Sequence, residues 1–348
     1  MNYIEGLRDE IKQYYKILSK EFPEFLYNYI NTHEMQRIKG SSIVCGTDWT
    51  NLYHNKFYYT NLEHSIGVAL IIWNFTKDKK QTLAGLFHDI ATPAFKHCID
   101  FMNGDYTNQE STEAKTENII KNSEDIMNLL EHDGIKLEEV VNYHIYPIAD
   151  NDTPKLSADR LEYTFMNGIF FEEVWDLEII KKIYDNIEIL INEEGIHELG
   201  FKNIEIAEEF IKRASKIWPK WIDSKDKLTM QFIADTVRKM NENRLLQIED
   251  LYTYSEKEII EKINNCRIKE IEVAFKNFQE ATKMYEGNEY VQDKYCISIE
   301  SKRRYINPLV KGKNEVKRIK DISNMAKQDI ENYLKFKTKK YAYFDFSF

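Results

Sequence analysis

The chain has few of the residues that interrupt or cross-link regular structure. Its 348 residues include only 12 glycines, 6 prolines and 4 cysteines. Scarce glycine and proline predict long helices with few irregular segments. No Cys-x-x-Cys pair occurs, which argues against a zinc ribbon or a disulfide framework, and a reducing cytoplasm is the expected setting. The four cysteines lie far apart, at Cys45, Cys98, Cys266 and Cys296.

Long apolar runs and targeting signals are also lacking. The longest apolar stretch, near residues 67–75, is far shorter than the roughly 20 residues of a membrane-spanning helix. The first residues include acidic side chains and no apolar segment of a signal peptide, so we expect no membrane association. Neither G-x-x-x-x-G-K-[ST] nor G-x-G-x-x-G occurs, which excludes the P-loop and Rossmann nucleotide sites.

The composition is that of a soluble globular protein, with 43% hydrophobic and 30% charged residues. The net charge is −10, but residues 302–340 hold 13 Lys/Arg against 4 Asp/Glu, so they carry +9 and the remainder −19. An acidic body argues against general nucleic-acid binding. The basic segment is compatible with anion binding, with docking onto an acidic body, or with a solvated basic face.

Apolar residues recur at helical spacing through most of the first 250 residues. We expect helices over residues 62–77, 81–90, 112–131, 135–145, 156–167, 176–193, 204–217, 225–243, 256–285 and 314–335. Residues 294–310 and 339–348 are rich in β-branched and aromatic side chains and predict short strands. The expected fold is therefore mainly α, with a helical domain over residues 1–287 and a small α+β C-terminal subdomain over residues 288–348.

Three predicted helices carry His or Asp side chains that suit metal ligation. His64 lies near the start of helix 62–77, His88 and Asp89 end helix 81–90, and Asp159 lies in "LSADRLEYT". If the first two helices form an antiparallel hairpin, His64 and His88 are offset by about 9 Å along straight ideal axes. An earlier start of the second helix, or a tilt of either helix, would bring them together.

The segments "NLEHSIGVAL", "GLFHDIATPAFKH" and "SADRLEYT" together resemble the H…HD…D signature of the HD-domain metal-dependent phosphohydrolases. "MQRIKG" and "RRYINPLV" are also similar to segments of the deoxynucleoside triphosphate triphosphohydrolase branch of that superfamily. The resemblance implies an all-helical HD-domain core. It also implies an enzyme that cleaves a phosphate ester or anhydride in a small-molecule substrate, which is expected to be a nucleotide.

The resemblance further assigns His64, His88, Asp89 and Asp159 to one divalent metal ion, which could be Mn, Mg, Fe, Co, Ni or Zn. Two neutral imidazoles and two carboxylates balance a 2+ charge and leave positions for water and a phosphate oxygen. Relatives commonly assemble, so a homo-oligomer is also suggested.

The chain departs from the branch pattern HD-x-G-H-x-P-F-x-H, because it reads "HDIATPAFKH". Thr92 replaces the second histidine, whereas His97 matches the last one, and Asp100 matches an acidic position of the branch. We therefore predict His97 and Asp100 as the acid–base residues. Tyr163, one turn after Asp159, could contact substrate or pack in the core.

Other departures affect the expected grip on a triphosphate. Asn108 stands where the branch has a catalytic histidine, Met166-Asn167 replaces an Arg-Asp pair, and Asn61-Leu62 replaces Arg-Phe. Glu110 and Glu113 are further nearby candidates for acid–base work. A second hypothesis follows from these losses, namely a nucleotide-binding regulatory protein of HD fold with weak or no turnover.

Three consecutive basic residues are predicted to bind phosphate in an active or allosteric site: Lys302, Arg303 and Arg304. Alternatively, they belong to an edge strand whose charges protect it from aggregation. The remaining histidines have no companion signal that separates them from surface residues; they are His33, His54, His132, His144 and His197.

Overall fold

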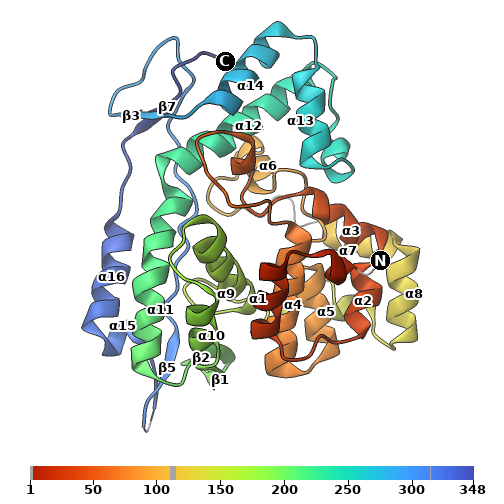
Figure 1. Ribbon diagram of the computed structural model, residues 1–348, viewed down its shortest axis with the longest axis vertical. Helices are drawn as coiled ribbons and strands as arrows, with labels where there is room; N and C mark the ends of the chain where they lie inside the picture. Colours follow the sequence, from red (N-terminus) through yellow and green to blue (C-terminus); the bar gives the residue numbers. More distant parts are fainter. Residues whose placement is uncertain (1–2, 110–114, 314) are drawn as a thin grey trace.

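The computed structural model describes residues 3–109, 115–313 and 315–348, and it is mainly helical (Figure 1). The α-helices are α1 (Asp9–Leu18), α2 (Phe25–Ile30), α3 (His33–Arg37), α4 (Asn61–Thr76), α5 (Lys79–Phe87), α6 (His97–Met102), α7 (Thr116–Asn122), α8 (Glu124–His132), α9 (Ala158–Met166), α10 (Leu177–Tyr184), α11 (Ile204–Ile217), α12 (Ser224–Glu242), α13 (Glu256–Asn264), α14 (Lys269–Glu280), α15 (Ile319–Ile322) and α16 (Asn324–Lys335). The strands are β1 (Ile187–Ile191), β2 (His197–Phe201), β3 (Tyr285–Gly287), β4 (Cys296–Ile297), β5 (Leu309–Lys311), β6 (Val316–Arg318) and β7 (Tyr341–Tyr343). Within the described ranges, no helix has the length and apolar character that crossing a bilayer requires.

Helices α4 and α5 form the hairpin at the centre of the fold. Thr60 and Glu63 begin α4 with a reciprocal capping box, and residues 61–72 are buried on every side, as befits a core helix. The side chain of Asp78 then caps α5. A Cβ on Gly85 would lie 2.1 Å from Ile72 Cδ1, so this glycine lets the two helices approach closely.

Two apolar clusters fill the interior. The larger surrounds α4 and includes residues of α1, α9 and α11. The smaller lies around α6, α12, α13 and α14, at the end of the molecule that also holds β3 and β7 (Figure 1). The loop between α5 and α6 therefore runs from one cluster to the other.

The strands make two small sheets, ordered β1-β2-β5-β6 and β3-β7-β4. β5 pairs in parallel with β2, and α16 packs on α11, so residues 288–348 run along the helical body. The buried Glu198 of β2 joins two distant segments, because it accepts hydrogen bonds from the Leu156 amide and from Arg318. Leu156 lies just before α9, and Arg318 ends β6.

Several helix predictions were wrong in extent. The helix predicted over residues 176–193 ends at Tyr184, and β1 follows it because the hairpin partner β2 and the turn at Gly195 (φ 77°) favour extended backbone. Residues 135–145 contain two 3₁₀ turns instead of a helix. Helix 256–285 is divided between α13 and α14, and residues 316–318 form a strand before α15. The part of helix 112–131 over residues 112–114 lies outside the described residues.

Candidate metal centre

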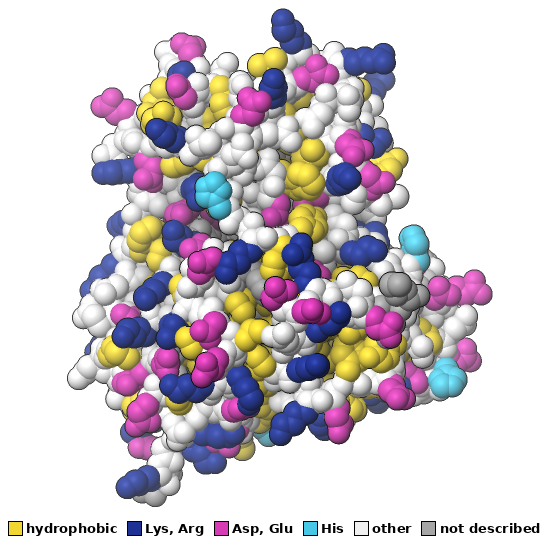
Figure 2. All heavy atoms as spheres, in the orientation of Figure 1, with side chains coloured by type: hydrophobic (Ala, Val, Ile, Leu, Met, Phe, Trp, Pro, Cys, Tyr) yellow, Lys and Arg dark blue, Asp and Glu magenta, His cyan; other side chains and the backbone are white. Residues whose placement is uncertain are grey.

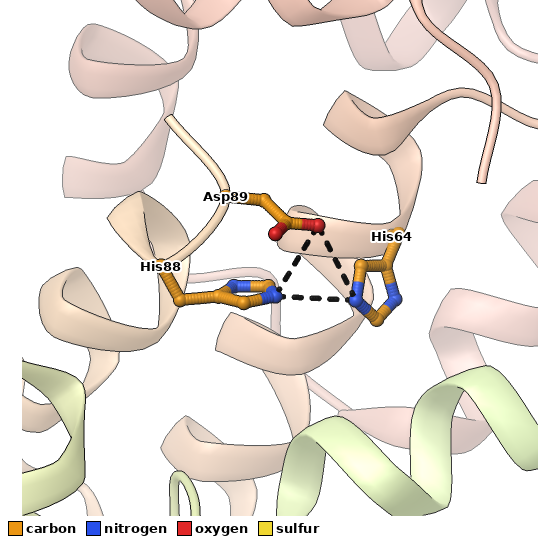
Figure 3. Close-up of side chains that lie close together, drawn as sticks. All are labelled: His64, His88 and Asp89. Carbon is orange, nitrogen blue, oxygen red and sulfur yellow. Dashed lines mark hydrogen bonds and ion pairs between the residues drawn. The ribbon is translucent and has the colours of Figure 1, made fainter. Parts of the chain in front are cut away.

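The imidazoles of His64 and His88 face each other through their Nε2 atoms, which are 3.2 Å apart (Figure 3). His64 comes from the first turn of α4, and His88 follows the last residue of α5. The Nδ1 atom of His88 donates to the Gly85 carbonyl at 2.7 Å, and that of His64 bonds to the Glu162 carboxylate. When both rings are neutral with the proton on Nδ1, as in a metal complex, each Nε2 directs a lone pair at the same point.

Two carboxylates complete this cluster. Asp89 Oδ2 lies 3.9 Å from His64 Nε2 and 3.6 Å from His88 Nε2, and Asp159 Oδ1 lies 3.1 and 3.6 Å from the same atoms. Ligands about 2.1 Å from a metal ion lie about 3–3.5 Å from one another. Ring nitrogens and carboxylates at such spacings are stabilised by a cation that they share. Three of the predicted ligands, His64, His88 and Asp89, thus form a group that could hold a metal ion, and Asp159 lies beside both imidazoles.

The charges of these groups are strongly coupled. Burial by itself raises the pKa of Asp89, but the positive charges of Lys96, His88 and His64 hold that pKa well below its usual range. Burial likewise lowers the pKa of His64, yet the Glu162 charge and the bond to Asp159 outweigh this and raise it to about 9. The site therefore holds positive charge tightly between its carboxylates.

Glu162 is a supporting residue that the sequence analysis missed. Its side chain is fully buried in α9, where it bonds to His64 and accepts a hydrogen bond from the Tyr59 hydroxyl at 2.9 Å. A Cβ on Gly67 would lie 2.6 Å from Glu162 Oε1, so the glycine makes room for the carboxylate. The signal was present, because Glu162 lies three residues after Asp159 and thus on the same helix face.

The predicted acid–base pair lies at the start of α6. His97 Nδ1 is 2.9 Å from Asp100 Oδ2, and the Asp100 carboxylate is fully buried. Burial lowers the pKa of His97, and the bond to Asp100 partly opposes this. Of the replaced positions, Thr92 is buried and Asn108 is exposed. Glu110 and Glu113 lie outside the described residues.

The four candidate ligands adjoin a cavity of about 670 Å³, which His64, His88, Asp159 and His97 line directly. Tyr163 lines it too, with its ring 5.2 Å edge-to-face from that of Trp221. The basic side chains on its wall are Lys96, Arg160, Lys220, Lys225, Lys302 and Arg304, and the acidic ones are Asp150, Asp152, Asp159, Glu172 and Asp226.

The three predicted phosphate-binding residues of the C-terminal segment separate in the structure. Lys302 and Arg304 line the cavity, where Arg304 donates to Gln109 Oε1 at 2.6 Å and Lys302 to the Asn108 carbonyl. Arg303 instead donates to the carbonyls of Tyr333 and Phe336 at the end of α16. Part of the basic segment docks on the acidic body, as Arg318 does with Glu193 and Glu198. Acidic and basic side chains are interspersed over the face shown in Figure 2.

Two more residues of the cavity wall had no signal in the sequence. His144 is exposed, as expected, and it also lines the mouth of the cavity, with its Nδ1 3.1 Å from Asp150 Oδ2. Lys96 also lines it, and its ammonium lies 2.6 Å from Asp89 Oδ2.

Comparisons with known proteins find partial similarities, one of them to a metal-dependent phosphohydrolase. No family model matches the chain. Over 142 residues it is 31% identical to the uncharacterized protein YdhJ of Bacillus subtilis, and this match covers 40% of this chain and 42% of YdhJ. Over 165 residues it is 26% identical to the metal-dependent phosphohydrolase cns2 of Cordyceps militaris, covering 47% of this chain and 45% of cns2. The chain thus spans less than half the length of these curated relatives.

Solved structures show that the fold has precedents over nearly the whole chain. A phosphohydrolase from Bacteroides thetaiotaomicron superposes with a TM-score of 0.60 at 12% identity, over 93% of this chain and 96% of that one. A hypothetical protein from Aquifex aeolicus gives a TM-score of 0.58 at 16% identity, over 93% of both chains. At these identities the likeness concerns the fold alone.

Proposed function

We propose that the protein is a metal-dependent phosphohydrolase that cleaves a phosphate ester or anhydride, with a nucleotide as the expected substrate. The observation that carries this proposal is the cluster of His64, His88 and Asp89, with Asp159 against both imidazoles, beside a cavity of about 670 Å³. The partial similarity to a metal-dependent phosphohydrolase supports the same activity.

The four converging side chains would hold the metal. A divalent ion supplies two things when bound there, a lower pKa for a coordinated water and neutralisation of phosphoryl charge. Glu162 and the Gly85 carbonyl fix the two imidazoles by their Nδ1 atoms, which keeps both Nε2 lone pairs directed at the centre. This orientation is set by buried groups before substrate arrives.

His97 is the proposed proton carrier. Asp100 engages its Nδ1, which leaves Nε2 as the nitrogen for proton exchange with the substrate's leaving oxygen. Burial lowers the pKa of His97, which favours the neutral ring that takes up a proton from the attacking water. The buried Asp100 stabilises the imidazolium that this transfer creates.

The cavity wall offers both parts that a nucleotide needs. Lys302 and Arg304 supply positive charge for phosphates, while Tyr163 and Trp221 present aromatic rings against which a base can pack. The narrowest form of this proposal is specificity for deoxynucleoside triphosphates. Thr92 and Asn108 differ from the pattern of that branch, so this form has the least support from the sequence.

These two replacements also favour a second candidate, a nucleotide-binding regulatory protein without appreciable turnover. Purified protein incubated with Mn²⁺, Mg²⁺, Co²⁺ or Fe²⁺ and a panel of nucleotides and phosphate monoesters separates the two. The enzyme releases phosphate, pyrophosphate or triphosphate, and Asp89→Ala abolishes release while Asp321→Ala, an exposed position on α15, does not. Saturable nucleotide binding without any product supports the regulatory protein instead.

A further inference from the structure

The loop between α5 and α6 holds two consecutive residues in a disfavoured backbone conformation. Phe95 has φ 65°, and Lys96 has φ 46° with ψ −119°. L-residues rarely adopt positive φ, and such strain persists only where the surroundings enforce it. Glycine would adopt this conformation freely, yet the chain places a lysine there.

The surroundings of this loop do enforce it. The Phe95 side chain is fully buried in the smaller apolar cluster, and its amide donates to Glu256 Oε1 at 3.2 Å. On either side, the Ala94 amide donates to the Leu251 carbonyl at 2.8 Å and the Lys96 amide to the Pro93 carbonyl at 3.1 Å. The backbone direction at Lys96 is therefore fixed from outside the metal centre.

This direction carries the Lys96 ammonium into the candidate metal centre. Its Nζ atom lies 2.6 Å from Asp89 Oδ2 and 3.2 Å from Asn61 Oδ1, and its side chain is only 15% exposed. An ammonium has three N–H donors, and these two contacts use two of them. Because Lys96 also lines the cavity, a ligand in that cavity can reach the same group.

The charges around the centre permit an anionic ligand at this group. A divalent ion balances the carboxylates of Asp89 and Asp159, and the Lys96 charge is offset by Glu162, which lies behind His64 and away from Asp89. Asp89 does not need the lysine as a counterion when it ligates a metal, so the ammonium, which lines the cavity, can bond to an anion there.

We propose that Lys96 is a phosphate-binding residue of this site, whose ammonium bonds to a non-bridging oxygen of a phosphate held beside the metal. This inference rests on the proposed function and assigns to the substrate an anionic phosphoryl group within reach of both cations. The fixed loop places the ammonium there in advance, which lowers the entropic cost of binding phosphate.

The test compares Lys96→Met and Lys96→Gly with the wild type by isothermal titration calorimetry. Mn²⁺ is titrated first, and inorganic phosphate is then titrated into the Mn²⁺-loaded proteins. Both variants are expected to keep Mn²⁺ affinity, or to gain it a few-fold because a like charge is gone. Both are expected to bind phosphate about ten- to a hundred-fold more weakly, as befits the loss of a charge-assisted hydrogen bond.

Lys77 provides matched controls, because it is also a lysine at positive φ (53°), at the C-terminal end of α4. Lys77→Gly and Lys77→Met repeat the backbone and charge changes outside the cavity, and neither should alter phosphate binding. Thermal unfolding of all four variants checks the fold. Lys96→Gly should unfold at a temperature equal to or above that of Lys96→Met, since glycine relieves the strain.

Two results would overturn the inference and leave the proposed function standing. One is equal phosphate affinity in the wild type and Lys96→Met. The other is a loss of Mn²⁺ affinity in Lys96→Met with phosphate binding unchanged, which would make the lysine a positioning residue for Asp89. A wild-type protein that takes up no metal overturns both proposals.

Discussion

Replacing Glu162 with glutamine tests whether the buried support of His64 determines metal affinity. The substitution keeps the size of the side chain and removes its charge. In the wild type, the carboxylate bonds to His64 Nδ1 and accepts from the Tyr59 hydroxyl. The glutamine carbonyl oxygen can serve only one of these partners at full strength, and the amide nitrogen offers hydrogens to the other.

The expected magnitude follows from the position of Glu162 behind a ligand. Loss of a partner that orients a metal-bound imidazole weakens metal binding about 10- to 100-fold, which corresponds to about 1.4–2.8 kcal/mol. The Glu162 charge is also the largest influence that raises the pKa of His64, so this pKa should fall in the variant. The four ligands themselves are unchanged, and the fold should be retained.

Mn²⁺ affinity is measured by calorimetry or by competition with a chelating dye, and circular dichroism checks the fold. Tyr59→Phe is the matched control, because it removes one hydrogen bond to the carboxylate but keeps the charge beside His64. We expect Tyr59→Phe to weaken Mn²⁺ binding much less than Glu162→Gln. Equal Mn²⁺ affinity in the wild type and Glu162→Gln would refute the assigned role of Glu162.

Three further predictions concern stability. The folded protein holds a proton on His64 more tightly than the unfolded chain does, because the pKa of His64 is raised to about 9. Metal-stripped protein should therefore lose up to about 3 kcal/mol of unfolding free energy between pH 6.5 and pH 9, whereas Mn²⁺-loaded protein should not. Urea unfolding across this pH range measures both. Gly67→Ala should lower the free energy of unfolding, measured with urea, by about 1–3 kcal/mol and should also weaken Mn²⁺ binding, because the new Cβ would meet Glu162. Gly6→Ala, which has open space around it, should change neither quantity. Arg303→Ala should lower the thermal midpoint by releasing the end of α16 yet leave phosphate affinity unchanged, and a fall in that affinity would place Arg303 in the site after all.

Local periodicity was sufficient to locate the helices that carry the site. The expected ranges 62–77 and 156–167 agree closely with α4 and α9, because their apolar faces are long and their caps are local. The helix expected over residues 81–90 begins at Lys79, and an earlier start is one of the two changes expected to reduce the offset between His64 and His88. β1 escaped prediction because Ile187–Ile191 is stabilised by β2, whose own neighbour β5 lies more than a hundred residues away.

The contents of the site were predictable to different degrees. Glu162 could have been found from its spacing to Asp159, since a helix fixes which residues share a face. Lys96 could not, because its approach to Asp89 depends on a positive φ that a lysine rarely adopts and that the packing of Phe95 imposes. Arg303 and Arg304 are adjacent in sequence but serve different parts of the molecule, and only the tertiary structure separates them.

The bond network of Glu198 has a consequence for how the protein is made. A nascent chain carries all four candidate ligands once residue 159 has been synthesised, but Arg318 leaves the ribosome much later. Until then Glu198, which fastens the backbone at Leu156 ahead of α9, has no cation beside it. The ion pair that supports the segment ahead of Asp159 can therefore form only after residue 318 has been synthesised.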